Sequence, residues 1–298
     1  MRLTTVISAA DAGRKIKYFV RGSLHISYAQ YCAAKRMNLI CANGSPVHAD
    51  YLLREGDVIS VDLPELGAEK SVLPESGEIC IAYADDDIAI IDKPAPLACQ
   101  CTPKQPMGTL ENRIVWHYRS LPDFVFRPLN RLDRGTSGLM CIALHAHAYQ
   151  RLQKQLHTDA FVREYAAIVE GVLAGEGTID LPIGKENAAS VRRIIDFENG
   201  RRAVTHYRAA ACDQRCTMVR LRLETGRTHQ IRTHLSAIGH PIVGDFLYGT
   251  EDPSLPNRFA LHSSRIRLIH PITGETIECN SDLPDQLRAL IHQNDDCK

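Results

Sequence analysis

Residues 128–139 place one acidic side chain between two basic ones and lead directly into an apolar segment. Asp133 stands between Arg131 and Arg134, and Leu139–Leu144 follows after a turn and has the character of a buried strand. Flanking guanidinium groups favour the charged form of a carboxyl group, which makes it a poor general acid. Such a carboxylate is better suited to act as a nucleophile or to anchor an ion pair. In an extended segment, Arg131 and Asp133 would project to one side while Leu132 enters the core.

A second segment, residues 223–245, predicts a strand, a sharp turn and a short helix. Gly226 permits the turn, Thr228 is a candidate helix cap, and the helix is expected to end near Ile238. The free amides at the start of such a helix suit an anion. Arg232 lies one turn into the helix, where it could reach a nearby carboxylate. Without further context, the pair of Arg131 and Asp133 fits a buried ion pair that holds a turn somewhat better than a catalytic group.

Metal-binding patterns are missing from the sequence. His229 and His234 are five residues apart and would lie on different faces of a helix, and the ten cysteines include no Cys-x-x-Cys pair. A two-metal nuclease would need clustered carboxylates near the other motifs, and the acidic run Asp85–Asp87 lies in a predicted turn far from them. We therefore expect neither a metal nor a cofactor.

The formal net charge is zero, which argues against a strongly basic nucleic-acid binder. Arginine is nevertheless concentrated between residues 192 and 232, where ten arginines accompany four acids. The arginines are Arg192, Arg193, Arg201, Arg202, Arg208, Arg215, Arg220, Arg222, Arg227 and Arg232. This pattern fits phosphate binding about as well as it fits a solvated sheet edge.

The chain divides into three parts by composition. Residues 1–63 read as a small module with helices over 15–21 and 27–36, strands near 39–40 and 58–61, and a tight turn at Asn43-Gly44. Residues 64–78 are rich in Pro, Glu, Gly and Ser and are expected to form a linker. Residues 79–298 are expected to form the catalytic domain.

Strands and helices are interspersed in this third part. Strands are expected over 79–83, 88–91, 163–169, 203–209 and 218–223, with a helix over 148–157. This mixture indicates an α+β or a mixed α/β domain. No apolar stretch approaches the length of a membrane span, and the N-terminus lacks a signal-peptide core. We therefore expect a cytoplasmic protein without membrane contacts.

Several motifs resemble the pseudouridine synthases that modify large-subunit ribosomal RNA, the RluA/RluD family. Residues 130–139 resemble the family's His-Arg-Leu-Asp-Arg-Asp-Thr-Ser-Gly-Leu, with Asn130 and Gly135 in place of His and Asp. Residues 226–234 are similar to its Gly-Arg-x-His-Gln-Ile-Arg-x-His motif, and 163–171 to the strand that carries an active-site tyrosine. Residues 92–96 resemble its Lys-Pro-x-Gly loop, with Pro96 in place of Gly. Residues 14–63 resemble the α-L RNA-binding module of a small-subunit ribosomal protein and some aminoacyl-tRNA synthetases.

The resemblance implies an α+β catalytic domain on a mixed, mainly antiparallel sheet, preceded by an α-L module. It implies an isomerase that detaches the base of a uridine, rotates it and rejoins it through carbon 5, without cofactor or metal. Asp133 would be the essential carboxylate, Arg232 its ion-pair partner, and Tyr165 the residue that stacks on the flipped base. The implied RNA-binding residues are Arg131, Arg134, Arg227, His229 and Lys93.

The implied partner is ribosomal RNA, with transfer RNA as the alternative, and a monomer is expected. A non-catalytic RNA-binding or ribosome-assembly protein with the same fold is the rival from another class. Asp133 argues against this rival, because a carboxylate beside RNA is electrostatically unfavourable unless the chemistry uses it.

Overall fold

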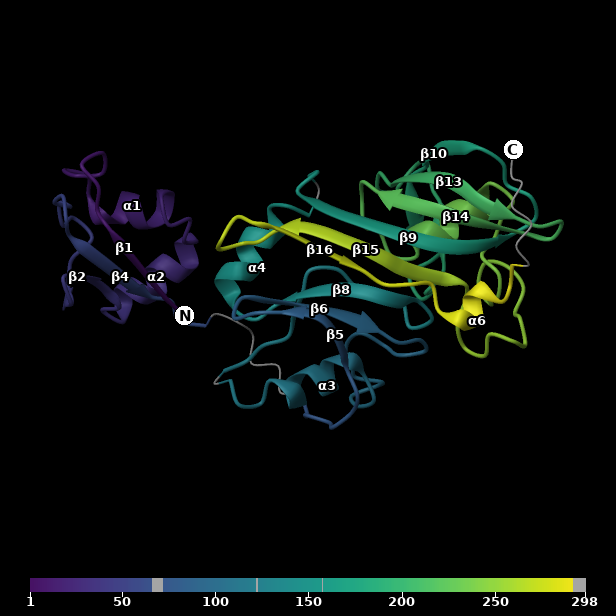
Figure 1. Ribbon diagram of the computed structural model, residues 1–298, viewed down its shortest axis with the longest axis horizontal. Helices are drawn as coiled ribbons and strands as arrows, with labels where there is room; N and C mark the ends of the chain where they lie inside the picture. The colour runs from purple at the N-terminus through teal and green to yellow at the C-terminus, as the bar shows by residue number, and fades with distance from the viewer. Residues whose placement is uncertain (66–71, 122, 157, 292–298) are drawn as a thin grey trace.

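The computed structural model describes residues 1–65, 72–121, 123–156 and 158–291. Residues 1–63 form a four-stranded antiparallel sheet with two helices, which Figure 1 shows in purple and blue at one end of the molecule. The sheet order is β1-β4-β2-β3, and the module has a hydrophobic core of its own. Its elements are β1 (Arg2–Val6), α1 (Ile16–Gly22), α2 (Tyr28–Arg36), β2 (Ile40–Ala42), β3 (Ser45–Pro46) and β4 (Val58–Asp62).

Local signals in this module predicted its structure well. The Ser27 side chain caps α2 by accepting a hydrogen bond from the Gln30 backbone amide at 3.1 Å. Asn43 and Gly44 both have positive φ, 51° and 81°, as the tight hairpin between β2 and β3 requires. β1 was not predicted, since its exposed alternate residues give only a weak strand pattern.

The remainder of the chain is built on a ten-stranded sheet in the order β10-β13-β14-β9-β15-β8-β6-β5, with β16 beside β15 and β7 beside β8. All pairings are antiparallel except β8 with β15, which confirms the mixed, mainly antiparallel α+β fold. The strands are β5 (Cys80–Ala84), β6 (Ile88–Lys93), β7 (Arg127–Pro128), β8 (Ser137–Ala143), β9 (Phe161–Glu170), β10 (Glu176–Asp180), β13 (Val204–Cys212), β14 (Cys216–Leu223), β15 (Leu261–Ile269) and β16 (Thr276–Asn280).

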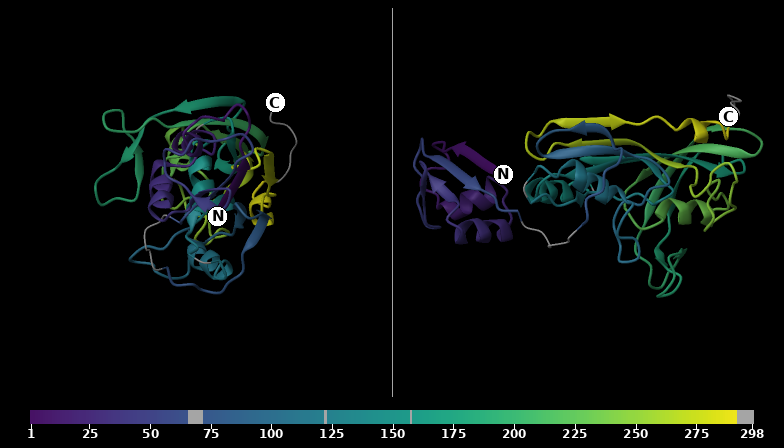
Figure 2. Two further views of the ribbon diagram at one scale, coloured as in Figure 1. Left: turned by 90° about the vertical axis from the view of Figure 1, so that its left-hand side faces the viewer. Right: turned by 90° about the horizontal axis from the view of Figure 1, so that it is seen from below.

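Helices and a hairpin complete this part of the molecule. They are α3 (Leu110–His117), α4 (Ala146–Gln153), α5 (Gln230–Ala237), α6 (Asp285–Arg288) and the hairpin of β11 (Ile183–Lys185) and β12 (Arg193–Ile195). Figure 2 shows the hairpin extending away from the body of the sheet. No helix in the described ranges is both long and apolar enough to cross a membrane.

Hydrophobic side chains pack on both faces of the sheet, and β8 contributes to both. Met140 and Ile142 belong to the larger cluster, together with residues of α3 and α5, whereas Leu139 and Cys141 belong to the smaller cluster with residues of α4. This alternation follows from the two-residue period of a strand that is buried on both faces. It places α5, and with it Arg232, on the same face as the larger core.

Helix ends were predicted less accurately than helix positions. α4 begins at Ala146, where the His145 side chain accepts a hydrogen bond from the Ala148 amide, and it ends at Gln153. The predicted end of this helix at residue 157 lies outside the described residues. Thr228 does not cap α5, because His229 occupies that position in a left-handed conformation with φ of 57° and the helix starts one residue later.

Residues 66–71 of the expected linker lie outside the described residues. The described residues on either side of them make defined contacts with the larger part of the chain. Glu65 binds Arg127 at 2.7 Å, and the Leu73 carbonyl accepts a hydrogen bond from Asn112 Nδ2 at 2.8 Å. The two ends of the expected linker are therefore attached to the surface beside α3 and β7.

Candidate active site

A cleft of about 870 Å³ opens between the segment 126–134, strand β9 and the start of α5. Asp133 is the single carboxylate among its lining residues, whereas six arginines line it. The arginines are Arg127, Arg131, Arg134, Arg163, Arg227 and Arg232. A concave surface lined by one sign of charge concentrates ions of the opposite sign. The cleft therefore favours polyanions although the whole chain is neutral.

Asp133 and Arg232 meet inside this cleft. Arg232 Nη1 donates a hydrogen bond to Asp133 Oδ2 at 3.0 Å, and the Asp133 side chain is 27% exposed. Oδ2 is the oxygen engaged by this bond, and no residue in the described ranges hydrogen-bonds Oδ1. One oxygen of Asp133 is thus fixed, and the other is left free for a ligand.

Asp245 binds Arg232 on the side away from Asp133, a role that the sequence analysis did not assign to it. Its carboxylate accepts bidentate hydrogen bonds from Arg232 Nε at 2.7 Å and Nη2 at 2.8 Å, and it is fully buried. Burial alone would lower the pKa of Arg232, but the bonds to Asp245 and Asp133 outweigh this effect and raise it. The ring of Phe259 lies 4.1 Å from the guanidinium carbon of Arg232. Arg232 is therefore a permanently charged and rigidly held partner of Asp133.

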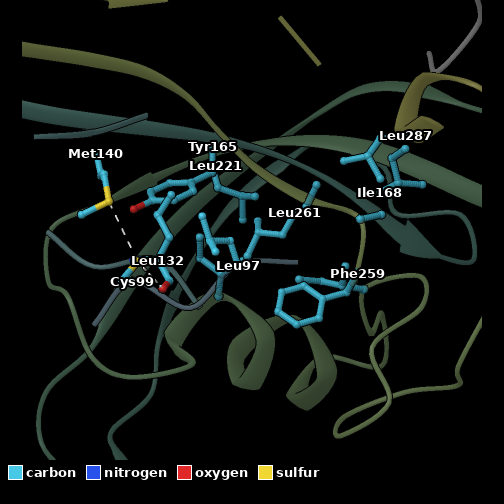
Figure 3. Close-up of a cluster of buried hydrophobic side chains, with 14 of the residues drawn as sticks. Leu97, Cys99, Leu132, Met140, Tyr165, Ile168, Leu221, Phe259, Leu261 and Leu287 are labelled. Atoms are coloured by element: carbon cyan, nitrogen blue, oxygen red, sulfur yellow. Dashed lines mark hydrogen bonds between the residues drawn. The ribbon is translucent and has the colours of Figure 1, made fainter. Parts of the chain in front are cut away.

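Tyr165 projects from β9 into the larger core beside the cleft. Figure 3 shows its ring near Leu132 and Leu221. Burial raises the pKa of the Tyr165 hydroxyl, and the nearby Asp133 raises it further. The hydroxyl is therefore protonated at neutral pH, and the ring forms an apolar wall of the cleft.

His229 faces Asp133 rather than open solvent. Its Nε2 lies 3.8 Å from Asp133 Oδ2, and its Nδ1 is 2.9 Å from the Tyr248 hydroxyl. The Tyr248 oxygen accepts the Arg193 backbone amide, so its own proton is available to His229 Nδ1. Burial lowers the pKa of His229 below its ordinary value despite the opposing effect of Asp133. A neutral ring that accepts at Nδ1 carries its proton on Nε2, directed at Asp133.

Lys93 was expected to contact RNA, but the protein encloses its side chain. The side chain is completely buried, and its Nζ donates to the carbonyls of Pro94, Leu97 and Arg134 at 2.9, 2.8 and 3.5 Å. Burial lowers its pKa to about 8. The expectation that Lys93 contacts RNA is therefore wrong, because its contacts join the 94–97 loop to the segment that carries Asp133.

The other predicted binding residues lie at the rim of the cleft. Arg131 and Arg134 are exposed, and Leu132 between Arg131 and Asp133 is buried, as the alternation predicted. Arg227 is half-buried and donates its Nε to the Arg202 carbonyl at 3.0 Å. All three arginines line the cleft with guanidinium groups that can meet phosphate.

The arginine-rich segment is divided by the sheet. Arg208, Arg220 and Arg222 lie on the opposite face of β13 and β14, around a separate hollow of about 510 Å³. Acids accompany them there, with Arg222 2.6 Å from Asp159 and Arg208 3.9 Å from Glu176. For these arginines the solvated sheet surface is the better interpretation, and only Arg227 and Arg232 of the segment line the cleft.

The one described cluster with metal-ligand chemistry lies outside the cleft lining. Asp85, Asp87 and His270 bring their ligand atoms within 4.8 Å of one another. His270 Nδ1 accepts two backbone amides of the following turn, which leaves its proton on Nε2, 2.9 Å from Asp85. His145 likewise accepts a backbone amide at Nδ1 and directs Nε2 at Asp87 at 2.7 Å. Protonated nitrogens are poor metal ligands, so this arrangement suits contacts between histidine and carboxylate. His145 Nε2 is hydrogen-bonded to Asp87, whereas the close contact of His270 Nε2 with Asp85 lacks hydrogen-bond geometry.

Two of the three departures from the family motifs are explained by packing. Asn130 Oδ1 accepts the Cys141 amide of β8 at 2.9 Å, so this residue anchors the sheet beneath the cleft. A Cβ atom at Gly135 would lie 2.7 Å from the ring of Phe259. Because Gly135 has no side chain, it leaves room for the Phe259 ring that lies over the Arg232 guanidinium. The Ala95–Pro96 peptide bond is cis, and the adjacent Leu97 amide donates to the Arg134 carbonyl at 3.0 Å.

We expect Gly135→Ala to destabilise the protein by about 1–3 kcal/mol, because the new methyl group overlaps an aromatic ring in a packed site. Urea unfolding measures the change, and Gly22→Ala is the control, since its nearest neighbour would be 3.8 Å away. Combining Gly135→Ala with Phe259→Leu should recover part of the loss. Equal stability of Gly135→Ala and the native chain would contradict this packing account.

Known proteins are similar to this chain in sequence and in fold. The family model for RNA pseudouridylate synthase matches residues 87–237. The RNA pseudouridine synthase YhcT of Bacillus subtilis is 40% identical over 255 residues, which cover 84% of this chain and 83% of the relative. Ribosomal large subunit pseudouridine synthase D of Haemophilus influenzae is 38% identical over 230 residues, 71% of this chain and 69% of the relative. The structure of human RNA pseudouridylate synthase domain containing 1 is similar with a TM-score of 0.56 at 27% identity, covering 72% of this chain and 89% of that one.

Proposed function

Because the chain belongs to the RNA pseudouridylate synthase family and is an RNA pseudouridine synthase, we propose that it modifies uridines of large-subunit ribosomal RNA and uses Asp133 as its catalytic carboxylate. The observation that carries this proposal is the cleft in which Asp133 is the single carboxylate among six arginines. A polyanionic substrate is attracted by the arginines and meets one fixed carboxylate at the centre.

The reaction exchanges one bond to the sugar for another. The bond between uracil N1 and the ribose breaks, the base rotates, carbon 5 joins the ribose, and the proton of carbon 5 is lost while N1 gains one. Asp133 is the group that acts on the nucleotide, through Oδ1, since Oδ2 is engaged by Arg232. Arg232 holds that carboxylate in place from the protein side, and the His229 ring lies beside it at 3.8 Å.

Tyr165 supplies an apolar face for the flipped base and a protonated hydroxyl. We expect Tyr165→Phe to keep RNA affinity and to slow pseudouridine formation by roughly 10²-fold or more, the usual worth of a positioned proton donor or acceptor. Single-turnover kinetics at saturating protein would separate the two effects. Loss of affinity with an unchanged rate constant would show that the hydroxyl has no part in the chemistry.

The surrounding RNA would be held at two places. Arg131, Arg134 and Arg227 line the cleft, where they would contact the phosphates that flank the target. Residues 1–63 would act as an α-L RNA-binding module. Tyr18 and Tyr28 are exposed on its helices, with the cations of Lys17 and Arg21 4.9 and 5.1 Å from the ring centres. Aromatic and cationic side chains in such proximity suit stacking and phosphate contacts with RNA.

The target is tested with purified protein and RNA that lacks pseudouridine. Transcripts of ribosomal RNA and a pool of transfer RNA transcripts would be treated in parallel and mapped for pseudouridine. We expect modification of specific uridines in large-subunit ribosomal RNA. Modification of transfer RNA alone would move the substrate to that class, and modification of neither would favour an RNA-binding or ribosome-assembly role.

We further propose that the enzyme acts as a cytoplasmic monomer without a metal. Activity should therefore persist in the presence of a chelator, and the mass in solution should be that of one chain of 33.2 kDa. The isomerisation changes no oxidation state, which is why the chemistry needs no redox cofactor.

A further inference from the structure

Arg163 is a buried cation without an acidic partner. The residue is 6% exposed, and its Nε is enclosed without a hydrogen-bond partner. In the described part of the chain no hydrogen bond or ion pair involves its guanidinium. The guanidinium carbon lies 5.8 Å from the centre of the Phe161 ring, which is a cation–π contact. Most buried charges in proteins are paired, so this one requires an explanation.

The other buried arginines of the described residues all have polar partners. Arg127 binds Glu65 at 2.7 Å, Arg232 binds both oxygens of Asp245, and Arg258 has no acidic partner but donates hydrogen bonds to Gln286 and Ser137 at 3.1 Å. A cation–π contact offsets only part of the cost of taking a guanidinium out of water, and no carboxylate balances the charge of Arg163. The free protein therefore keeps Arg163 without a counter-charge, at an energetic cost. A cost of this kind is expected where a ligand supplies the missing charge.

The position of Arg163 indicates which ligand that is. Arg163 and Tyr165 are two residues apart on β9, so both project from the same face of the strand, and both line the cleft with Asp133. Glu164 between them lines the hollow on the opposite face. The guanidinium reaches Gly226, where a Cβ atom would lie 3.2 Å from Arg163 Nη1. Arg163 thus lies between the wall that stacks on the base and the loop that leads into α5.

We propose that Arg163 binds a backbone phosphate of the RNA next to the flipped uridine, an assignment that rests on the proposed function. A non-bridging phosphate oxygen carries the full negative charge that a buried guanidinium lacks, and a planar guanidinium can bind two such oxygens at once. A carbonyl of uracil would leave the charge unpaired. Gly226 provides the space in which the phosphate and the guanidinium meet.

Stability gives the first test, because a binding role and a structural role of Arg163 predict changes in melting temperature of opposite sign. We expect Arg163→Met to raise the melting temperature in phosphate-free buffer, since the substitution removes an unpaired buried charge and keeps the length of the side chain. A residue that holds the fold together would lower it. Arg220→Met is the matched control, because Arg220 is exposed on the opposite sheet face and outside the cleft.

Anion binding gives the second test and does not depend on catalysis. Inorganic phosphate should raise the melting temperature of the native chain and of Arg220→Met more than an equal ionic strength of chloride does. This increment should be lost in Arg163→Met. It should be reduced in Gly226→Ala, which keeps Arg163 but crowds Nη1. Gly226→Ala is an independent second variant, because it leaves the Arg163 side chain in place.

RNA binding gives the third test, with a short oligouridylate as the probe. Arg163→Met should weaken binding by about 10-fold or more, and the slope of log affinity against log salt should fall by about 0.7, the value of one phosphate contact on a single strand. Arg163→Lys should recover part of the affinity. Arg220→Met should leave both quantities unchanged.

The proposal is overturned if Arg163→Met lowers the melting temperature, or if its affinity and salt slope equal those of Arg220→Met. Since none of these measurements uses isomerase activity, they can succeed even if the protein modifies no ribosomal RNA. Failure of the proposed function would appear separately, as an absence of pseudouridine formed by the native chain.

Discussion

Asp133→Asn is expected to abolish pseudouridine formation, with a rate reduction of about four orders of magnitude or more, while the protein stays folded and binds RNA at least as tightly as before. An amide of the same shape cannot act as a nucleophile, which accounts for the loss of rate. The fold should survive because Arg232 keeps its bidentate bonds to Asp245. RNA affinity should rise slightly, since the only carboxylate lining the cleft is removed.

Single-turnover conversion of a modified transcript and filter binding with the same RNA would measure the two effects together. Asp159→Asn is the control, because Asp159 is an exposed carboxylate that binds Arg222 on the outer face of the sheet. It should leave the rate unchanged. A rate for Asp133→Asn within tenfold of the native rate would exclude Asp133 as the catalytic group.

Asp245→Asn is expected to lower both stability and activity, although Asp245 touches no part of the cleft surface. The substitution leaves the buried guanidinium of Arg232 without its main counter-charge, and breaking a buried pair in this way costs about 3–5 kcal/mol. Arg232 would also lose the support that directs Nη1 at Asp133. We therefore expect a lower midpoint of urea unfolding and a slower single-turnover rate.

Glu278→Gln provides a matched control for this prediction. Glu278 binds Arg265 through the same bidentate geometry, at 3.0 Å for both bonds, but at the exposed surface. Exposed pairs contribute about 0–1 kcal/mol, so this variant should be nearly neutral. If Asp245→Asn and Glu278→Gln changed stability equally, the buried pair would not have the importance we assign to it.

Features that depend on neighbours in the sequence could be predicted from it. The cap of α2 at Ser27, the hairpin at Asn43-Gly44 and the fully buried strand β8 all arise from local rules and appear as expected. The contact between Asp133 and Arg232, 99 residues apart, came from the family motifs and not from any local pattern. Local sequence shows which side chains are available, and the sheet decides which of them meet.

The remaining features of the site depend on burial and long-range packing. Lys93 appeared available for RNA, yet the chain around it supplies three carbonyls and encloses it. Arg163 was treated as part of a strand, and its missing partner is visible only once all neighbouring acids are placed. Asp245 ends the segment 223–245 but was given no role, because nothing in the sequence shows that it contacts Arg232. The roles of these charged residues depend on their burial and on their neighbours in the folded chain, which local sequence does not show.

The most direct test is a pseudouridine map of total RNA from cells that lack the protein, complemented with either the native chain or Asp133→Asn. We predict that specific uridines of large-subunit ribosomal RNA lose their modification in the deletion strain, and that the native chain alone restores them. Restoration of the same sites by Asp133→Asn, or a map unchanged by the deletion, would contradict catalysis by Asp133.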